Sequence, residues 1–194
     1  MRRPGPRLRH PAPEYVYLLG IYLDDGYIAS HPRGVHKLRV TLDSKYPAIV
    51  SECESAMRAV APGNAVRRRT RVYNDIEVYS YSKSWPCLLP QHGAGKKHHR
   101  SIALTPWQSA LVGSNPQLLI RGLIQSDGCR FMNSGRGGWR AWRYRFDNHS
   151  PDIRSIFQKV CADLGLSPTT SGTVVYVSRI RDVARLDEWV GPKR

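Results

Sequence analysis

The sequence has little cysteine, no long apolar run and half as many acidic as basic residues. Its four cysteines, Cys53, Cys87, Cys129 and Cys161, form no CxxC pair and have no histidines at finger-like spacing, which argues against a structural zinc site. We expect reduced thiols in or near the core. Because no stretch approaches about 18 apolar residues, the sequence predicts no membrane-spanning helix.

The scarcity of acids leaves a strongly basic chain. Thirty Lys and Arg face fifteen Asp and Glu, which gives a net charge of +15 and an isoelectric point near 10.1. Such a charge favours a polyanionic partner, and nucleic acid before an anionic membrane surface. At 194 residues and 41% hydrophobic content, the chain can bury one good core or two small packed subdomains.

The first thirteen residues differ in composition from the rest of the chain. Residues 1–13 are basic and proline-rich and have no apolar centre, so they do not resemble a secretory signal. We expect a flexible arm that either contacts phosphates or has no role. The cysteine usage predicts a cytoplasmic protein, bacterial or phage-encoded, or an organellar one.

Two nine-residue segments are nearly alike. Residues 18–26 read LLGIYLDDG and residues 120–128 read IRGLIQSDG, and each closes an apolar run that is typical of a buried helix. A glycine in a helix interior costs about 1 kcal/mol relative to alanine, so Gly20 and Gly122 at matched positions indicate close approach of two backbones.

Each segment ends in an acid followed by a glycine. If the two helices cross at the first pair of glycines, Asp25 and Asp127 come together at their carboxyl ends. We expect Gly26 and Gly128 to end the helices in a left-handed conformation. Paired carboxylates of this kind are how proteins hold Mg²⁺ for phosphodiester hydrolysis.

The duplication extends beyond the two segments. Residues 36–43 and 142–147 alternate apolar with charged side chains, which predicts half-buried strands with a basic face. Pro47 and Pro151, 104 positions apart, each lead into an amphipathic helix.

Further strands complete the two halves. We expect them over residues 66–82 and 173–180. Each half then reads helix, strand, strand, helix, strand, strand. The prediction is an α+β fold of two pseudo-twofold αββαββ repeats, with subdomains at residues 14–100 and 101–194.

The paired segments resemble the LAGLIDADG motif of homing endonucleases, and the resemblance covers residues 14–193. It implies that the motif helices pack between the subdomains, and that the two sheets form a β-saddle over double-stranded DNA. It also implies cleavage with Mg²⁺, for which Mn²⁺ substitutes, leaving 3′ overhangs. Asp25 and Asp127, at the eighth position, become metal ligands, assisted by the seventh-position backbone carbonyls of Asp24 and Ser126. Asp24 adds a third carboxylate, which leaves the coordination open.

A basic residue near the end of each half is a further implication of the resemblance, because the family uses one to support the hydrolytic water. Lys97 and Lys193 correspond at an offset of 96. Lys96 competes with Lys97 for this role. Phosphate contact in a basic loop is the alternative to catalysis for all three lysines.

The polar strand faces supply candidate contacts to a DNA major groove. In the N-terminal half these are Lys37, Arg39, Thr41, Asp43, Arg67, Arg69, Arg71, Tyr73, Glu77 and Tyr79. In the C-terminal half they are Arg130, Arg136, Arg140, Arg143, Arg145, Asp147, Arg179 and Arg181. We expect the run 67–71 and a loop at 130–140 to contact mainly phosphates. Because the two sets differ, we expect a monomer on an asymmetric target.

The main alternative is a noncatalytic LAGLIDADG-fold protein, either a DNA-binding regulator or an RNA maturase. Retention of both acids, Asp25 and Asp127, favours the nuclease.

Overall fold

The fold is described from a computed structural model that covers residues 12–72, 74–191 and 193. The predicted arm at 1–13 therefore lies outside the described residues except for its last two positions. The predicted contact Tyr73 lies outside them as well, and of Arg136 only the backbone is described.

The N-terminal half forms one helix-covered sheet. Its elements are α1 (Ala12–Asp25), β1 (Gly26–Ser30), a short 3₁₀ turn η1 (Pro32–Gly34), β2 (His36–Asp43), α2 (Pro47–Val60), β3 (Val66–Thr70), β4 (Asp75–Ser82) and α3 (Trp85–Leu88). The four strands pair antiparallel in the order β1-β2-β4-β3. The strand predicted at 36–43 is confirmed, and its apolar residues are buried.

The C-terminal half repeats this order. After the turn η2 (Lys97–His99) and helix α4 (Pro106–Ser114), its elements are α5 (Pro116–Asp127), β5 (Gly128–Ser134), η3 (Arg136–Gly138), β6 (Arg140–Asp147), α6 (Pro151–Asp163), β7 (Thr169–Ser171), β8 (Val174–Val177) and α7 (Ile180–Val190). Its sheet has the matching order β5-β6-β8-β7. The duplicated αββαββ fold is confirmed.

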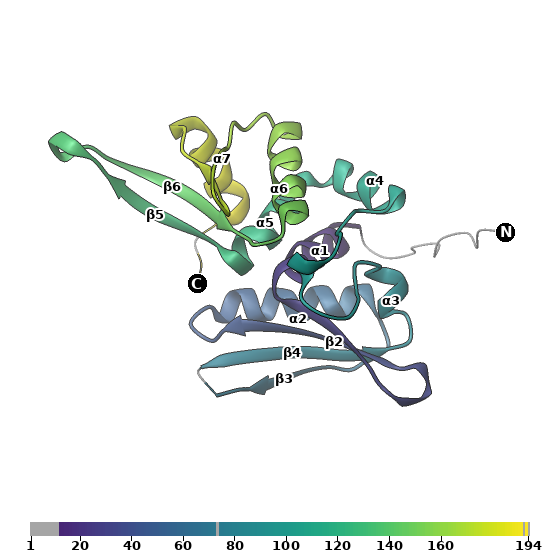
Figure 1. Cartoon of the computed structure of the whole chain (residues 1–194). Helices are drawn as coiled ribbons and strands as arrows, with labels where there is room; N and C mark the ends of the chain where they lie inside the picture. Colours follow the sequence, from purple (N-terminus) through teal and green to yellow (C-terminus); the bar gives the residue numbers. More distant parts are fainter. Residues whose placement is uncertain (1–11, 73, 192, 194) are drawn as a thin grey trace.

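Two predicted segments are wrong in detail. The strand expected at 173–180 ends at Val177, because Val183, Leu186 and Val190 recur at helical spacing and bury one face of α7. The loop expected at 130–140 is instead most of the β5–β6 hairpin, with a tight turn at Arg136–Gly138. Figure 1 shows this hairpin extending beyond the helices.

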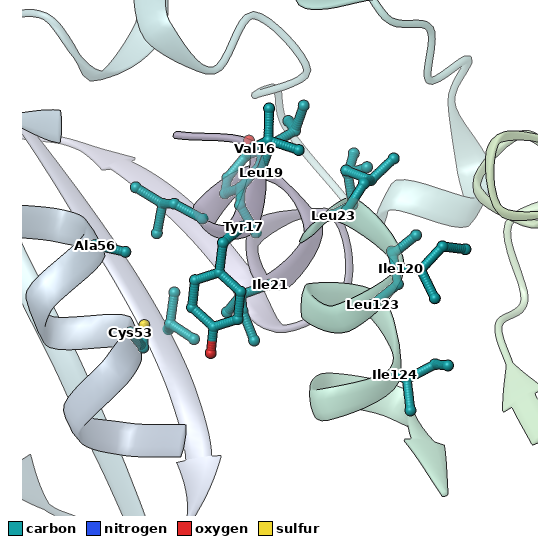
Figure 2. Close-up of a cluster of buried hydrophobic side chains, with 14 of the residues drawn as sticks. Val16, Tyr17, Leu19, Ile21, Leu23, Cys53, Ala56, Ile120, Leu123 and Ile124 are labelled. Carbon is teal, nitrogen blue, oxygen red and sulfur yellow. The ribbon is translucent and has the colours of Figure 1, made fainter. Parts of the chain in front are cut away.

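Helices α1 and α5 form the centre of the molecule, between the two sheets (Figure 1). Figure 2 shows apolar side chains of α1 between α2, marked by Cys53 and Ala56, and α5, marked by Ile120 and Leu123. The Tyr17 hydroxyl also crosses between the halves and donates to Gln125 Oε1 at 2.7 Å. The core therefore fixes one half on the other.

The close approach predicted at the first glycine pair is confirmed. A Cβ on Gly20 would lie 2.6 Å from the carbonyl oxygen of Leu119 and 3.0 Å from the Gly122 Cα, and a Cβ on Gly122 would lie 2.5 Å from the Tyr17 carbonyl oxygen. Because all of these neighbours are backbone atoms, the helices touch along their main chains.

The left-handed conformation expected at the second glycine pair is wrong. Gly128 is extended, with φ −96° and ψ 164°, and Gly26 is absent from the positive-φ residues. A Cβ at Gly26 would instead lie 2.6 Å from the Tyr22 Cα, and one at Gly128 2.7 Å from the Ile124 Cα. These glycines let each strand begin directly against the last turn of its own helix.

The cysteines of the described residues are free thiols. Cys53 and Cys161 are buried and Cys129 is half-buried, but Cys87 in α3 is exposed, so the near-core expectation is wrong for that residue. In the described part of the chain, no helix is both long and apolar enough to cross a bilayer.

Candidate functional site

Three carboxylates meet where α1 and α5 end. Asp24 and Asp25 close α1, and Asp127 closes α5. Burial raises the pKa of Asp25 to about 7, and the charge of Asp127 adds to the effect. Burial likewise raises the pKa of Asp24 and of Asp127 above the ordinary value. Such a cluster repels itself when ionised, and a bound cation would relieve that repulsion.

Two lysines reach the same place from the ends of the two halves. Lys97 Nζ donates to the carbonyl oxygens of Tyr22 and Asp24, the latter at 2.9 Å. Lys193 Nζ donates to the carbonyl oxygen of Ser126 at 3.2 Å. Asp24 and Ser126 occupy matching motif positions, so the two lysines have equivalent surroundings.

The degree of burial distinguishes Lys97 from its neighbour Lys96. Burial lowers the pKa of Lys97 to about 8 and lowers that of Lys193 as well. Lys96 is exposed. The geometry therefore favours Lys97 over Lys96 for the role left open by the sequence.

Two open hollows flank the helix ends. The larger, of about 600 Å³, contains Asp24, Lys97 and Asp127. The smaller, of about 220 Å³, contains Asp25 and Lys193. Each hollow thus combines the lysine of one half with the eighth-position acid of the other. We call these the larger and the smaller half-site.

Asp24 differs in its surroundings from the other two acids. One carboxylate oxygen accepts a hydrogen bond from Ser126 Oγ at 2.7 Å, and the other accepts one from Asn148 Nδ2. Both partners belong to the C-terminal half, so Asp24 forms a polar bridge between the halves. Its carboxylate is engaged there and is not a free third ligand. Asn148 was missed because nothing in the sequence shows that it reaches a residue 124 positions away.

Solved structures match this arrangement of helices and sheets. I-DmoI in complex with DNA and Ca aligns with a TM-score of 0.61 and 14% sequence identity, over 92% of this chain and 89% of that chain. The LAGLIDADG meganuclease I-AabMI, bound to uncleaved DNA, aligns with a TM-score of 0.56 and 11% identity, over 90% of this chain and 82% of that one. The chain has the LAGLIDADG homing-endonuclease fold.

A third solved structure also shares this fold. Full-length DUF199/WhiA from Thermatoga maritima aligns with a TM-score of 0.57 and 14% identity, over 95% of this chain but 57% of that chain. No protein-family model and no curated protein sequence matches the chain.

The donor chemistry at the LAGLIDADG helix ends fits a divalent cation. Within residues 12–72, 74–191 and 193, no three His, Cys, Asp or Glu side chains are arranged so that they alone could hold a metal ion. Mg²⁺ does not require such a group, because it keeps several waters and takes one or two carboxylates together with substrate phosphates. Asp25 and Asp127 would supply the carboxylates. The carbonyls of Asp24 and Ser126 each retain a second lone pair beside the lysine bond.

The polar face of the first sheet carries most of the predicted N-terminal contacts. Strand register places on this one face Lys37, Arg39, Thr41, Arg67, Arg69, Glu77 and Tyr79, with Asp43 at its end. Arg71 follows β3 directly. The expectation fails in one respect: Glu77 is completely buried and pairs with Lys37 at 2.6 Å, so neither presents a free group to a duplex.

The second sheet divides its predicted contacts between two faces. Arg143, Arg145 and Asp147 share the polar face, whereas Arg130 and Arg140 lie on the opposite one. Arg130 is further engaged there by Asp187 of α7, through bonds of 2.7 and 2.9 Å, and by the ring of Trp142. The Nε and Nη2 groups of Arg130 are therefore occupied by α7, on the face opposite to the polar face of the sheet.

Two arginines predicted on the last strand lie elsewhere. Arg179 precedes α7 and Arg181 is in its first turn, because the chain leaves the sheet at Val177. Arg179 donates to Ser167 Oγ at 2.7 Å. Neither belongs to the polar face of the second sheet.

Proposed function

We propose that this protein is a site-specific double-stranded DNA endonuclease that hydrolyses phosphodiester bonds with Mg²⁺, or with Mn²⁺ in its place, and leaves 3′ overhangs. The single observation that carries the proposal is the pair of half-sites, each with an eighth-position acid from one half and a lysine from the other. Paired half-sites suit the cutting of two strands.

The charge of the chain and of its sheets supports DNA as the substrate. The net charge is +15. Arg39, Arg67 and Arg69 lie on the polar face of the first sheet. Arg143 and Arg145 lie on the polar face of the second sheet. Arginines at such positions contact phosphates and guanine edges in the major groove.

The unlike sheets imply a monomer on an asymmetric target. Neither half-site is complete within residues 14–100 or 101–194, so cleavage requires both subdomains. I-DmoI and I-AabMI, which share the fold at low sequence identity, were solved with DNA.

The chain's own residues would position the scissile phosphates. When bound, the metal neutralises phosphate charge and lowers the pKa of a water ligand. Asp25 and Asp127 would hold that cation at the helix ends. Lys97 is mostly protonated at pH 7 because its pKa is about 8, so its ammonium can donate to a phosphate oxygen or to the attacking water. The seventh-position carbonyls keep each lysine directed at its half-site.

Selection from a random duplex library, with and without Mg²⁺, tests the proposal. We expect the wild-type protein to enrich one long asymmetric sequence, and to cut it only when Mg²⁺ is present. Enrichment without scission at any Mg²⁺ concentration would instead support a noncatalytic DNA-binding regulator, the second candidate, which the match to WhiA favours. Preference for folded RNA over duplex would support a maturase.

The two adjacent lysines give a matched pair of variants. Lys97→Met should slow cleavage of the selected target by about 10²-fold or more, the usual contribution of a positioned proton donor or acceptor. Lys96→Met removes the same charge from an exposed side chain and should cleave at nearly the wild-type rate. Single-turnover assays at saturating protein measure both, and equal losses would show that the lysines only contact phosphate.

A further inference from the structure

Glu77 is completely buried although it lies on the polar face of the first sheet. Register pairs it with Thr41 on β2 and with Arg69 on β3. Lys37 Nζ donates to its carboxylate at 2.6 Å, Arg71 Nη1 lies at 3.4 Å, and Arg69 Nη2 lies at 3.5 Å. Three basic side chains therefore cover one acid.

The four side chains form two layers. Lys37 is only 14% exposed and lies over the Tyr79 ring at 4.2 Å, whereas Arg69 and Arg71 are 60% and 41% exposed. Burial tends to raise the pKa of Glu77, but the hydrogen bond and charge of Lys37 outweigh it and lower that pKa below its usual value. An ionised carboxylate thus stays beneath two guanidinium groups.

This arrangement leaves the two arginines available for a ligand. An arginine carries five N–H donors in a planar fork, so one edge can face Glu77 while the remaining donors face outward. Restricting a long side chain before binding lowers the entropy lost on binding. Arginine donating twice to the O6 and N7 atoms of guanine is the commonest specific contact in the major groove.

We propose that Glu77 is a positioning residue that fixes Arg69 and Arg71 for guanine recognition in the part of the target beneath the first sheet. The inference rests on the proposed DNA-binding function and adds its base preference. In the second sheet Tyr176 takes the equivalent place, since it pairs with Arg145 as Glu77 pairs with Thr41. The guanine preference that depends on Glu77 therefore belongs to one half of the target.

Binding-site selection without divalent metal tests this inference separately from cleavage. We expect wild type to enrich a motif with guanines in one half. In Glu77→Gln the preference for those guanines should fall about tenfold, because Arg69 and Arg71 are no longer fixed. The base preferences at other positions should remain. The non-specific affinity of this variant should stay equal or rise, since the net charge increases by one.

Glu54→Gln is the matched control. Glu54 is also nearly buried and pairs with two arginines, Arg58 and Arg68, but Arg68 lies on the opposite face of the sheet from Arg69. This variant changes the charge equally and should select the wild-type motif. Loss of the same guanines in Glu54→Gln would overturn the inference.

The other possible outcomes also test the proposed role of Glu77. A folded Glu77→Gln that keeps the guanine preference overturns the inference and leaves the proposed function standing. Should Glu77→Gln not fold by circular dichroism, Arg69→Lys and Arg71→Lys replace it, since lysine lacks the planar fork. Retention of the guanines by both lysine variants overturns the inference. A wild type that enriches no motif overturns the proposed function as well.

Discussion

Asp25→Asn and Asp127→Asn should each reduce double-strand cleavage of the selected target about 10³-fold or more. Each substitution removes an anionic donor from the place where the Mg²⁺ would bind. The metal contributes several kcal/mol of charge stabilisation, and each 1.36 kcal/mol corresponds to a factor of ten in rate. DNA binding should persist or strengthen, because a negative charge near the phosphates is lost.

Single-turnover cleavage at saturating Mg²⁺, beside a binding assay without metal, measures the two effects separately. Asp163→Asn is the control, because Asp163 is an exposed acid on α6 that pairs with Lys159. It makes the same charge change and should cleave normally. Wild-type rates in either Asp25→Asn or Asp127→Asn would show that the paired acids have no catalytic role.

In the absence of metal, Asp25→Asn should also change how the stability of the protein depends on pH. Asp25 has a pKa of about 7 in the folded chain against an ordinary value of 3.8. The folded state therefore resists ionisation of Asp25, so this residue costs no stability below about pH 4 and an increasing amount as the pH rises towards 7. Asparagine does not ionise and avoids this loss.

Without metal, the free energy of unfolding of Asp25→Asn should therefore be ~2–4 kcal/mol higher than that of wild type at pH 8. Near pH 4 the two values should be equal. Urea denaturation at both pH values measures the difference. A constant difference between the proteins at all pH values would contradict the raised pKa. A gain at pH 8 would also show that lost cleavage does not result from misfolding.

Gly20→Ala and Gly122→Ala should each destabilise the protein by ~3 kcal/mol, which lowers the melting temperature by roughly 6–12 °C for a chain of this length. The added methyl group would lie within 2.6 Å of a backbone carbonyl oxygen on the opposite helix. Backbone cannot turn aside as a side chain does, so relief requires separating α1 from α5. Cleavage should fall too, because the half-sites are shared between these helices.

Gly113 supplies the control for these glycines. It lies in α4, and a Cβ there would meet no atom within 4 Å. Gly113→Ala should therefore leave stability unchanged or raise it by up to ~1 kcal/mol, the intrinsic helix preference for alanine. Thermal unfolding of the three variants compares them directly. Equal behaviour of all three would mean that the two motif helices are not in backbone contact.

The sequence predicted elements well where a local signal existed. Strict alternation located the strand at 36–43, and Pro47 and Pro151 located the starts of α2 and α6. Helix α4 was missed although Thr105 and Gln108 form a capping box that the sequence displays. Helix α7 was missed because a short valine-rich strand precedes it without a glycine or proline between them.

From the sequence, the site could be predicted only where the two halves place equivalent residues. Equivalence of the halves identified Asp25, Asp127, Lys97 and Lys193, whose positions the structure brings together in two half-sites. Partners from distant segments left no such signal. Which face Arg130 occupies depends on the register of β5 against β6, and a one-residue shift would reverse it.

The bridge from Asp24 to Ser126 and Asn148 has a consequence for the engineering of the chain. A symmetric protein made from two copies of the N-terminal half would set one Asp24 against another, because a second Asp24 would take the place of Ser126. Two buried acids would then repel each other at the dimer centre. The two halves therefore complement each other as unlike partners, and an engineered symmetric version would need Asp24 replaced.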